Sequence, residues 1–154
     1  MVVSNNPKIW GPILWRKLHT LSFQYPMKID ENDPTDLKIR DTVRKLFMDL
    51  RNSIPCKTCR DSYRMFLKQI PIEPHLGGRD MLSKWLYRLH NKVNAKLRNL
   101  ERAKYTQSIM QLETEARLRR MSSDQFNKMK QLLKQSILIT GPDPTFEYVK
   151  SLYQ

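Results

Sequence analysis

The sequence predicts an all-α fold, a bundle of four helices followed by further helices toward the carboxyl end. Apolar residues recur three and four positions apart in successive segments, which is the spacing of an amphipathic helix. Only four glycines occur among the 154 residues, and the sequence contains no convincing pair of strands and no internal repeat. The length fits a single domain with an apolar core.

Prolines delimit the first two helices. We expect one helix over residues 10–25, between Pro7 and Pro26, and a second that begins after Asp33-Pro34, a pair suited to a helix N-cap and first turn. The apolar positions of the first helix are Leu14, Leu18, Leu21 and Tyr25, and those of the second are Ile39, Val43, Leu46, Phe47, Leu50 and Ile54. These positions should face the core.

The third helix begins with a pair of cysteines. Pro55 interrupts the second helix, and the C-x-x-C segment 56–59 opens the third. Its inward positions are Cys59, Tyr63, Phe66 and Ile70. After a loop over residues 71–78, a fourth helix is expected from Asp80 to about Leu100, with Leu82, Trp85, Leu86, Leu89, Val93 and Leu97 on its buried side.

Residues 101–154 have a different character from the bundle that we expect at 1–100. The segment 101–135 is highly charged, and two interrupted apolar stripes predict one or two outer helices. Residues 140–144 break the pattern. Phe146, Tyr148, Val149 and Leu152 then predict a short terminal helix on the core. We interpret 101–154 as a charged helical extension that packs on the bundle or on a partner.

The composition is strongly basic, with 28 Lys and Arg against 15 Asp and Glu and a formal net charge of +13. Such a charge suits nucleic acid, acidic partners or simple solubility. The basic run of the extension is Arg117, Arg119, Arg120, Lys128, Lys130 and Lys134. Because Glu113, Glu115 and Asp124 are interspersed, a solvated helix face is favoured and no nucleic-acid partner is expected.

Neither a membrane segment nor a secretory signal is recognisable in the sequence. No run of about 18 uncharged apolar residues occurs, and the first ten residues lack a basic start followed by an apolar stretch. We therefore expect a cytoplasmic protein without a membrane partner.

Cys56 and Cys59 are the residues most suggestive of chemistry. A thiolate is the reactive form of cysteine, and a helix N-terminus together with neighbouring cations, here Lys57 and Arg60, lowers the pKa of a thiol. Two alternatives remain: reduced thiols that fill core space, and a zinc site. Zinc needs about four ligands, so two of His19, His75 and His90 would have to join the cysteines, in a spacing that matches no common zinc motif. We expect no metal.

The fourth helix carries polar residues beside its apolar face. His90 and Asn94 lie one turn apart, next to the positions of Leu86, Val93 and Leu97. Buried polar groups need hydrogen-bond partners, and a satisfied core histidine would explain either residue alone. The pair, together with Trp15 and His19 on the first helix, instead suggests a flat polar ligand between helices.

Three segments resemble the Erv/Alr family of flavin-dependent sulfhydryl oxidases. They are Trp10-Gly11-Pro12-Ile13-Leu14-Trp15 with Leu18-His19 and Tyr25-Pro26; Pro55-Cys56-Lys57-Thr58-Cys59; and Leu89-His90-Asn91-Lys92-Val93-Asn94-Ala95-Lys96-Leu97. They occur in the family's order and cover roughly residues 7–100. The short form is most similar to members encoded by large cytoplasmic DNA viruses.

The resemblance implies a four-helix bundle that holds FAD between its helices, with a redox-active Cys56–Cys59 disulfide against the flavin ring. The cofactor-binding residues that it implies are Gly11, Trp15, His19, Asn52, Tyr87, His90, Asn91, Val93, Asn94, Lys96 and Leu97. Tyr148 is added as aromatic cover over the adenine. Gly11 is expected to permit close approach at the start of the helix.

The resemblance also implies the reaction and the partners. A substrate thiolate attacks Cys56, a second thiol releases the product disulfide, and Cys59 passes two electrons to FAD. Oxygen reoxidises the flavin and yields hydrogen peroxide. The implied partners are a thioredoxin-like or other thiol-bearing protein and a second copy of the chain in a homodimer. The viral likeness implies the host cytoplasm, virus assembly and a place in the virion. A basic helical module that binds nucleic acid or zinc is the alternative function.

The sequence departs from the family pattern in places. Tyr87 stands where many cellular members have a structural cysteine, and Pro12 replaces a basic residue. No second C-x-x-C pair occurs, so Cys56 should meet its client directly.

Overall fold

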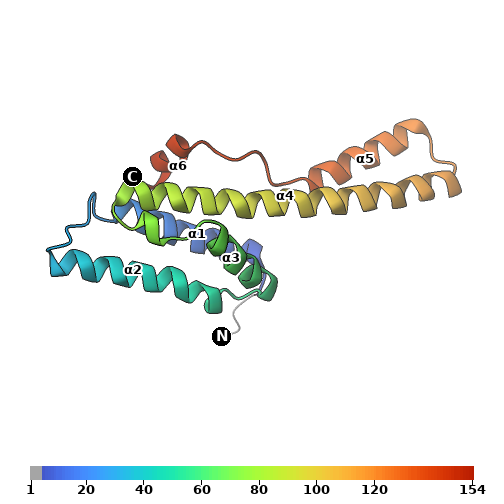
Figure 1. The fold of residues 1–154 in the computed structure, drawn as a ribbon. Helices are drawn as coiled ribbons and strands as arrows, with labels where there is room; N and C mark the ends of the chain where they lie inside the picture. Colours follow the sequence, from blue (N-terminus) through green and yellow to red (C-terminus); the bar gives the residue numbers. More distant parts are fainter. Residues whose placement is uncertain (1–4) are drawn as a thin grey trace. The chain divides into compact units, whose positions relative to one another are not determined.

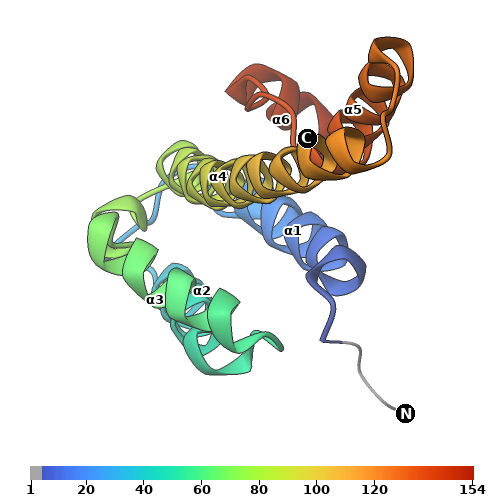
Figure 2. The same ribbon diagram turned by 90° about the vertical axis from the view of Figure 1, so that its right-hand side faces the viewer.

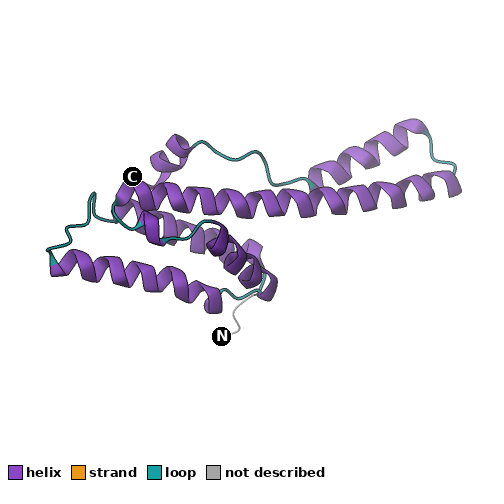
Figure 3. Cartoon of the chain, viewed as in Figure 1, coloured by secondary structure: helices purple, strands orange, loops and turns teal. Residues whose placement is uncertain are grey.

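The computed structural model describes residues 5–154, and within that part of the chain all regular structure is helical (Figures 1 and 3). Its elements are α1 (Pro7–Gln24), α2 (Pro34–Ser53), α3 (Lys57–Gln69), the 3₁₀ turn η1 (Glu73–His75), α4 (Arg79–Leu118), α5 (Ser123–Ile137) and α6 (Phe146–Tyr153). The predicted all-α class is confirmed. None of the described helices combines the length and the apolar composition needed to cross a membrane.

The chain divides into two compact units. One comprises the residues up to His90 together with Pro144–Gln154, and the other comprises Asn91–Asp143. The first unit contains α1, α2, α3, the beginning of α4 and α6. The second contains the rest of α4 and α5.

Polar residues cap the helices and fix where they begin. The Asn6 side chain accepts a hydrogen bond from the Lys8 amide, and Pro7 takes the first helical position, so α1 starts three residues earlier than predicted. Asp33 caps α2 in the same way, as its sequence predicted. Thr145 caps α6.

The fourth helix is longer than predicted. α4 continues past Leu100 for a total of 40 residues and ends at Leu118. Residues 101–118 contain neither glycine nor proline, so nothing in the chain stops the helix there. It ends where Arg120 adopts a positive φ of 50° and the Met121 amide donates to the Ala116 carbonyl.

The core of the first unit joins α2, α3 and the beginning of α4. Trp85 of α4 is fully buried, meets the Phe47 ring edge-on at 5.1 Å, and donates its indole N–H to the Ile70 carbonyl at 2.7 Å. The Tyr63 hydroxyl of α3 donates to the Phe47 carbonyl at 2.6 Å. Figure 2 shows α2 and α3 side by side. These bonds satisfy polar groups that the aromatic packing would otherwise bury without partners.

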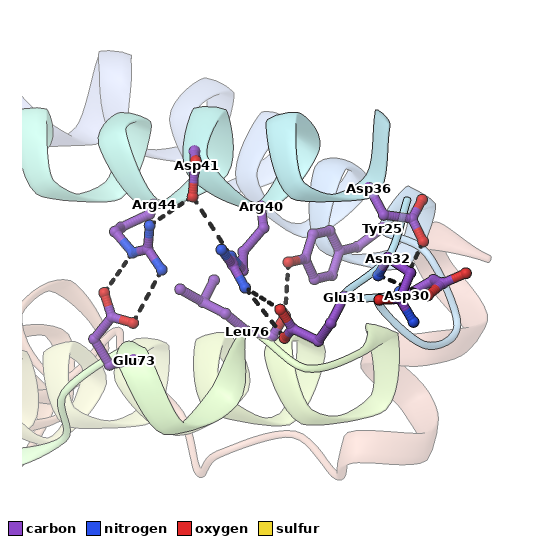
Figure 4. Close-up of polar contacts among 10 residues, drawn as sticks. All are labelled: Tyr25, Asp30, Glu31, Asn32, Asp36, Arg40, Asp41, Arg44, Glu73 and Leu76. Carbon is purple, nitrogen blue, oxygen red and sulfur yellow. Dashed lines mark hydrogen bonds and ion pairs between the residues drawn. The ribbon is translucent and has the colours of Figure 1, made fainter. Parts of the chain in front are cut away.

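Ion pairs connect two loops to α2 (Figure 4). Arg40 binds Glu31 of the preceding loop at 3.1 Å, and Arg44 pairs with Glu73 of η1. Arg44 also binds Asp41 at 2.7 Å. The arginines thereby hold the loops at residues 25–33 and 70–78 against the same helix.

The two loops also meet each other directly. The buried Tyr25 donates its hydroxyl to the Leu76 carbonyl at 2.7 Å (Figure 4). A Cβ at Gly78 would lie 2.5 Å from the Met27 carbonyl oxygen. Glycine is required at position 78 because the two backbones approach too closely for a side chain.

The second unit folds back on itself through α5. The capping box of Ser122 and Gln125 starts α5, and Leu112 and Ile137 are its buried apolar residues. The Glu101 carboxylate accepts from the Thr140 amide at 2.8 Å, and Arg98 binds Asp143 at 2.8 Å. These contacts hold residues 140–143 to α4.

Candidate active site

The two cysteines lie at the start of α3, as the sequence predicted. Cys56 is the N-cap residue, and its sulfur accepts a hydrogen bond from the Cys59 amide at 3.4 Å. Its Sγ also lies 3.1 Å from the Thr58 hydroxyl oxygen. Both cysteines are free thiols and both are partly exposed. An external reactant can therefore reach the pair.

The environment of Cys56 favours its thiolate. The pKa of Cys56 is lowered from 9.0 to about 7, first by a hydrogen bond from the Cys59 side chain and then by one from the Thr58 hydroxyl. The cations expected to do this are engaged elsewhere, since Lys57 binds Asp61 at 3.0 Å and Arg60 donates to the Ile54 carbonyl at 2.7 Å. Hydrogen bonds at the helix N-terminus therefore take the role predicted for cations.

A cluster of aromatic rings lies between α1 and α4. Trp15 and His90 stack with ring centroids 3.8 Å apart and planes within 7°. His19 Nε2 lies 3.0 Å from His90 Nδ1, within hydrogen-bonding distance. Tyr153 of α6 stacks on the other side of His19, with centroids 5.1 Å apart. The structure thus brings together three of the residues predicted to bind the ligand.

His19 is held neutral in this cluster. It is only 2% exposed, and burial followed by the neighbouring His90 lowers its pKa from 6.5 to about 4. Its Nδ1 atom is buried without a hydrogen-bond partner among the described residues. A buried polar atom beside flat stacked rings fits a flat ligand with polar edges.

The remaining predicted residues of the first unit lie outside that cluster. The Tyr87 hydroxyl donates to the Pro144 carbonyl at 2.5 Å, and its ring meets Phe146 edge-on. Asn52 accepts from Arg64 at 3.0 Å. Apart from its chain neighbours and the nearby backbone of α1, no described heavy atom comes within 4 Å of a Cβ built at Gly11, so no other described segment makes the close approach expected there. A cofactor contact by these residues stays a prediction.

The other predicted residues follow His90 along α4, in the second unit. They are Asn91, Val93, Asn94, Lys96 and Leu97. The first four are partly buried, and Leu97 is exposed. Their predicted role in binding the cofactor remains a prediction.

Tyr153 is the residue that sequence reasoning missed. Phe146, Val149 and Tyr153 lie three and four positions apart, so they share the face of α6 that packs on the rest of the first unit. Tyr148 lies about 200° around the helix from Phe146 and is exposed. The predicted packing of Tyr148 and Leu152 on the core was wrong for this reason. The same spacing rule, started at Phe146, identifies Tyr153.

The described part of the chain offers no set of ligands for the zinc site considered as an alternative. Among residues 5–154, no three His, Cys, Asp or Glu side chains gather in a way that could hold a metal ion.

Comparison with known proteins identifies the family. The sequence model of the Erv1 / Alr family matches residues 12–115, which is more than half of the chain and includes both cysteines, Trp15, His19 and His90. The chain belongs to the Erv1/Alr family. The predicted resemblance is confirmed, and the helical fold described above is consistent with this membership.

Named relatives of this Erv1/Alr chain come from plants, fungi and a large DNA virus. An FAD-linked sulfhydryl oxidase of Arabidopsis thaliana is 36% identical, over 58% of this chain and 43% of its own. A probable FAD-linked sulfhydryl oxidase of Acanthamoeba polyphaga mimivirus is 32% identical, over 58% and 59%. A mitochondrial FAD-linked sulfhydryl oxidase of Saccharomyces cerevisiae is 31% identical, over 57% and 42%. The chain spans roughly half the length of these relatives.

Proposed function

We propose that this protein is an FAD-linked thiol oxidase that forms disulfide bonds in protein substrates and passes the electrons to oxygen. The observation that supports this most is the state of Cys56, a partly exposed N-cap thiol whose pKa is lowered to about 7 by Cys59 and Thr58. The names of the relatives, all FAD-linked sulfhydryl oxidases, support the same assignment.

The exchange steps follow from the chemistry of the two cysteines. A substrate thiolate attacks Cys56 Sγ in the oxidised pair, the bond between Cys56 and Cys59 breaks, and Cys59 leaves as a thiolate. A second substrate thiolate then attacks the substrate sulfur of the mixed disulfide and releases Cys56. Because the pKa of Cys56 is about 7, it is a good leaving group near neutral pH. The substrate becomes a disulfide and the enzyme a dithiol.

The dithiol must then be reoxidised, and FAD is the group proposed for this. Bound FAD supplies a two-electron acceptor for the dithiol and a site of reaction with oxygen, which yields hydrogen peroxide. We propose that Trp15, His19 and His90 hold it from α1 and α4. Their stacked rings suit a flat polar group, as does His19 Nδ1, which has no hydrogen-bond partner in the part of the chain that the structure describes. We propose that the other predicted residues also contribute to FAD binding. They are Gly11, Asn52, Tyr87, Asn91, Val93, Asn94, Lys96, Leu97 and Tyr148.

An absorption spectrum of the purified protein tests the cofactor, and oxygen uptake with dithiothreitol tests the reaction. We expect a bound-flavin spectrum that bleaches when dithiothreitol is added without air, and peroxide equal to the oxygen consumed. Cys56→Ser and Cys59→Ser should keep the flavin and lose turnover.

The exposed Ser53, at the end of α2, offers a matched control for these variants. Ser53→Ala should keep both flavin and turnover. A folded protein without flavin, or unchanged turnover in either cysteine variant, would contradict the proposal.

We propose further that the protein is a homodimer paired through its first two helices. Ile9 and Ile13 lie one turn apart on α1 and are both 57% exposed, and Leu46 of α2, which was predicted to be buried, is also exposed. Exposed apolar side chains on both helices suit an interface with a second copy of the chain. Light scattering should give twice the chain mass, and Ile13→Glu should give the chain mass alone.

The proposed setting is the cytoplasm of an infected host, with a role in virus assembly and a place in the virion. The mimivirus relative supports it. The proposed client is a thioredoxin-like or other thiol-bearing protein. In Cys59→Ser, the Cys56 thiolate can attack the disulfide of an oxidised client, which releases one client sulfur as a thiolate and leaves a mixed disulfide that no Cys59 can resolve. Trapping with this variant should recover the client by mass spectrometry.

A further inference from the structure

A hollow of about 410 Å³ opens between α2 and α3, and of its described lining residues only Asn52 belongs to those proposed above to hold FAD. Its lining residues are Met48, Arg51, Asn52, Arg64, Leu67 and Lys68. Leu67 is buried and Met48 is partly buried, and these two residues are the apolar part of its lining. Arg51, Arg64 and Lys68 add three positive charges, and none of the described residues that line the hollow carries a carboxylate. The lining therefore combines apolar and basic side chains.

The positive charges of this hollow are poorly compensated. Arg51 donates its Nε to the Met48 carbonyl at 2.7 Å, which fixes the guanidinium without neutralising it. Neither Arg51 nor Lys68 forms an ion pair with any residue that the structure describes. Arg64 binds Asn52 at 3.0 Å and approaches Asp61 only to 3.5 Å. A ligand that brings carboxylates would find these groups available.

The hollow lies farther along α3 than the cysteine pair at the start of the helix. Lys57, Asp61, Arg64 and Lys68 are spaced by four, three and four residues and therefore share one exposed face of the helix. Lys57 lies between the two cysteines. The rise of a helix places Lys68 roughly 16 Å beyond Lys57, a span that about five residues of extended peptide cover. A chain whose thiol reaches Cys56 can therefore also reach the hollow.

We propose that this hollow docks an acidic segment of the protein substrate, with one aliphatic side chain on Leu67 and Met48 and carboxylates on Arg51, Arg64 and Lys68. The proposal rests on the proposed oxidase function, because it concerns the substrate of the same cysteines. A peptide fits better than a nucleic acid, since among residues 5–154 no aromatic side chain that could stack on a base lines the hollow. The site favours clients that carry acidic residues a few positions from the reactive cysteine.

The first experiment measures binding without redox chemistry. The probe is a short fluorescein-labelled, cysteine-free peptide of alternating Glu and Leu, followed by fluorescence anisotropy with the full-length protein. Arg64→Gln together with Lys68→Gln should weaken binding about five-fold, as expected for the loss of two exposed charge pairs, and added salt should weaken binding to the unchanged protein. Equal affinity of the two proteins would overturn the proposal.

Two further variants separate a docking site from general charge and from folding. Lys38→Gln with Lys45→Gln removes the same charge from exposed positions of α2 that do not line the hollow, and binding should stay unchanged. Arg64→Lys with Lys68→Arg keeps the charge and should retain most of the affinity. Equal weakening by both double neutralisations would show non-specific attraction and overturn the site. A single-stranded oligonucleotide that competes better than the peptide would assign the hollow to nucleic acid instead.

A kinetic measurement keeps this inference distinct from the proposed oxidase function. With a reduced dithiol peptide that carries the acidic segment, the Arg64 and Lys68 double variant should raise KM about five-fold and leave kcat unchanged. Its oxidation of dithiothreitol should equal that of the unchanged protein. If the unchanged protein oxidised neither substrate, the oxidase function would fail while the binding result still decided the docking site. If both substrates were oxidised with KM unaltered by the variant, the docking site alone would fail.

Discussion

The imidazoles of His19 and His90 lie 3.0 Å apart, His19 Nε2 to His90 Nδ1, between α1 and α4. One ring nitrogen must donate and the other must accept, so the contact needs one proton between the two atoms. Because His19 is buried and its pKa is lowered to about 4, it stays neutral at physiological pH. Trp15 and Tyr153 stack on the outer faces of this pair.

Protonation of His19 should make the protein less stable in mild acid. Above pH 6.5 the side chain is neutral in both the folded and the unfolded protein, so it contributes no pH dependence. As the pH falls from 6.5 toward 4, the unfolded chain binds a proton that the folded protein does not. The free energy of unfolding should therefore fall by about 3 kcal/mol across this window. Urea unfolding at a series of pH values measures it.

Variants of two histidines isolate this contribution. His19→Gln should flatten the decline between pH 6.5 and 4 relative to the unchanged protein. His75→Gln, which removes a ring whose Nδ1 lies 3.0 Å from the Pro71 carbonyl oxygen, is the matched histidine control. Identical pH profiles for all three proteins would show that His19 is not the group responsible.

Two adjacent glycines should differ in their tolerance of alanine. At Gly78 a Cβ would meet the Met27 carbonyl oxygen at 2.5 Å, whereas at Gly77 it would meet only the Met81 sulfur at an ordinary 3.5 Å. Gly78→Ala must separate the two loops and should cost about 1–3 kcal/mol. Gly77→Ala should lie within about 0.5 kcal/mol of the unchanged protein. Thermal unfolding compares them, and equal melting temperatures would refute the close approach.

The helices of the first unit could be predicted because their limits and their buried faces are local properties of the chain. Pro26, Asp33-Pro34 and the C-x-x-C pair mark ends that the structure confirms, and Tyr63, Phe66 and Trp85 are buried as their spacing indicated. The length of α4 was missed because a change in composition near Leu100 is not a stop signal. Only a glycine, a proline or a cap ends a helix in such a charged segment.

The candidate site was predicted in its residue types and only partly in its contacts. Trp15, His19 and His90 are brought together as expected, since polar and aromatic residues beside an apolar stripe lie at helix interfaces. The cause of the low pKa of Cys56 was not predictable, because Lys57 and Arg60 have other partners that depend on the fold. Tyr153 was missed because Tyr148 and Leu152 were assigned to the buried face together with Phe146 and Val149, whereas helical spacing from Phe146 and Val149 leads to Tyr153.

The reactivity of Cys56 should titrate near neutral pH. Alkylation of the reduced protein by iodoacetamide, read at Cys56 by mass spectrometry, should rise with a midpoint of about pH 7. Cys59→Ala should move the midpoint upward, because it removes the hydrogen bond that contributes most. Thr58→Val should move it upward by less. Ser62→Ala, whose hydroxyl donates to the Thr58 carbonyl, should leave it in place. A midpoint near 9 in the unchanged protein would show that Cys56 is an ordinary thiol.

Alanine variants of Tyr153 and Tyr148 test the role of α6. Tyr153→Ala removes the ring stacked on His19 and should lower both the melting temperature of the flavin-free protein and the retention of flavin. Tyr148 is exposed, so Tyr148→Ala should leave the stability of the flavin-free protein unchanged. If Tyr148 nevertheless covers the adenine, its loss should weaken flavin retention alone. Melting curves before and after added FAD separate the two effects. Unaltered stability and flavin retention in Tyr153→Ala would show that the ring beside His19 supports neither the fold nor the site.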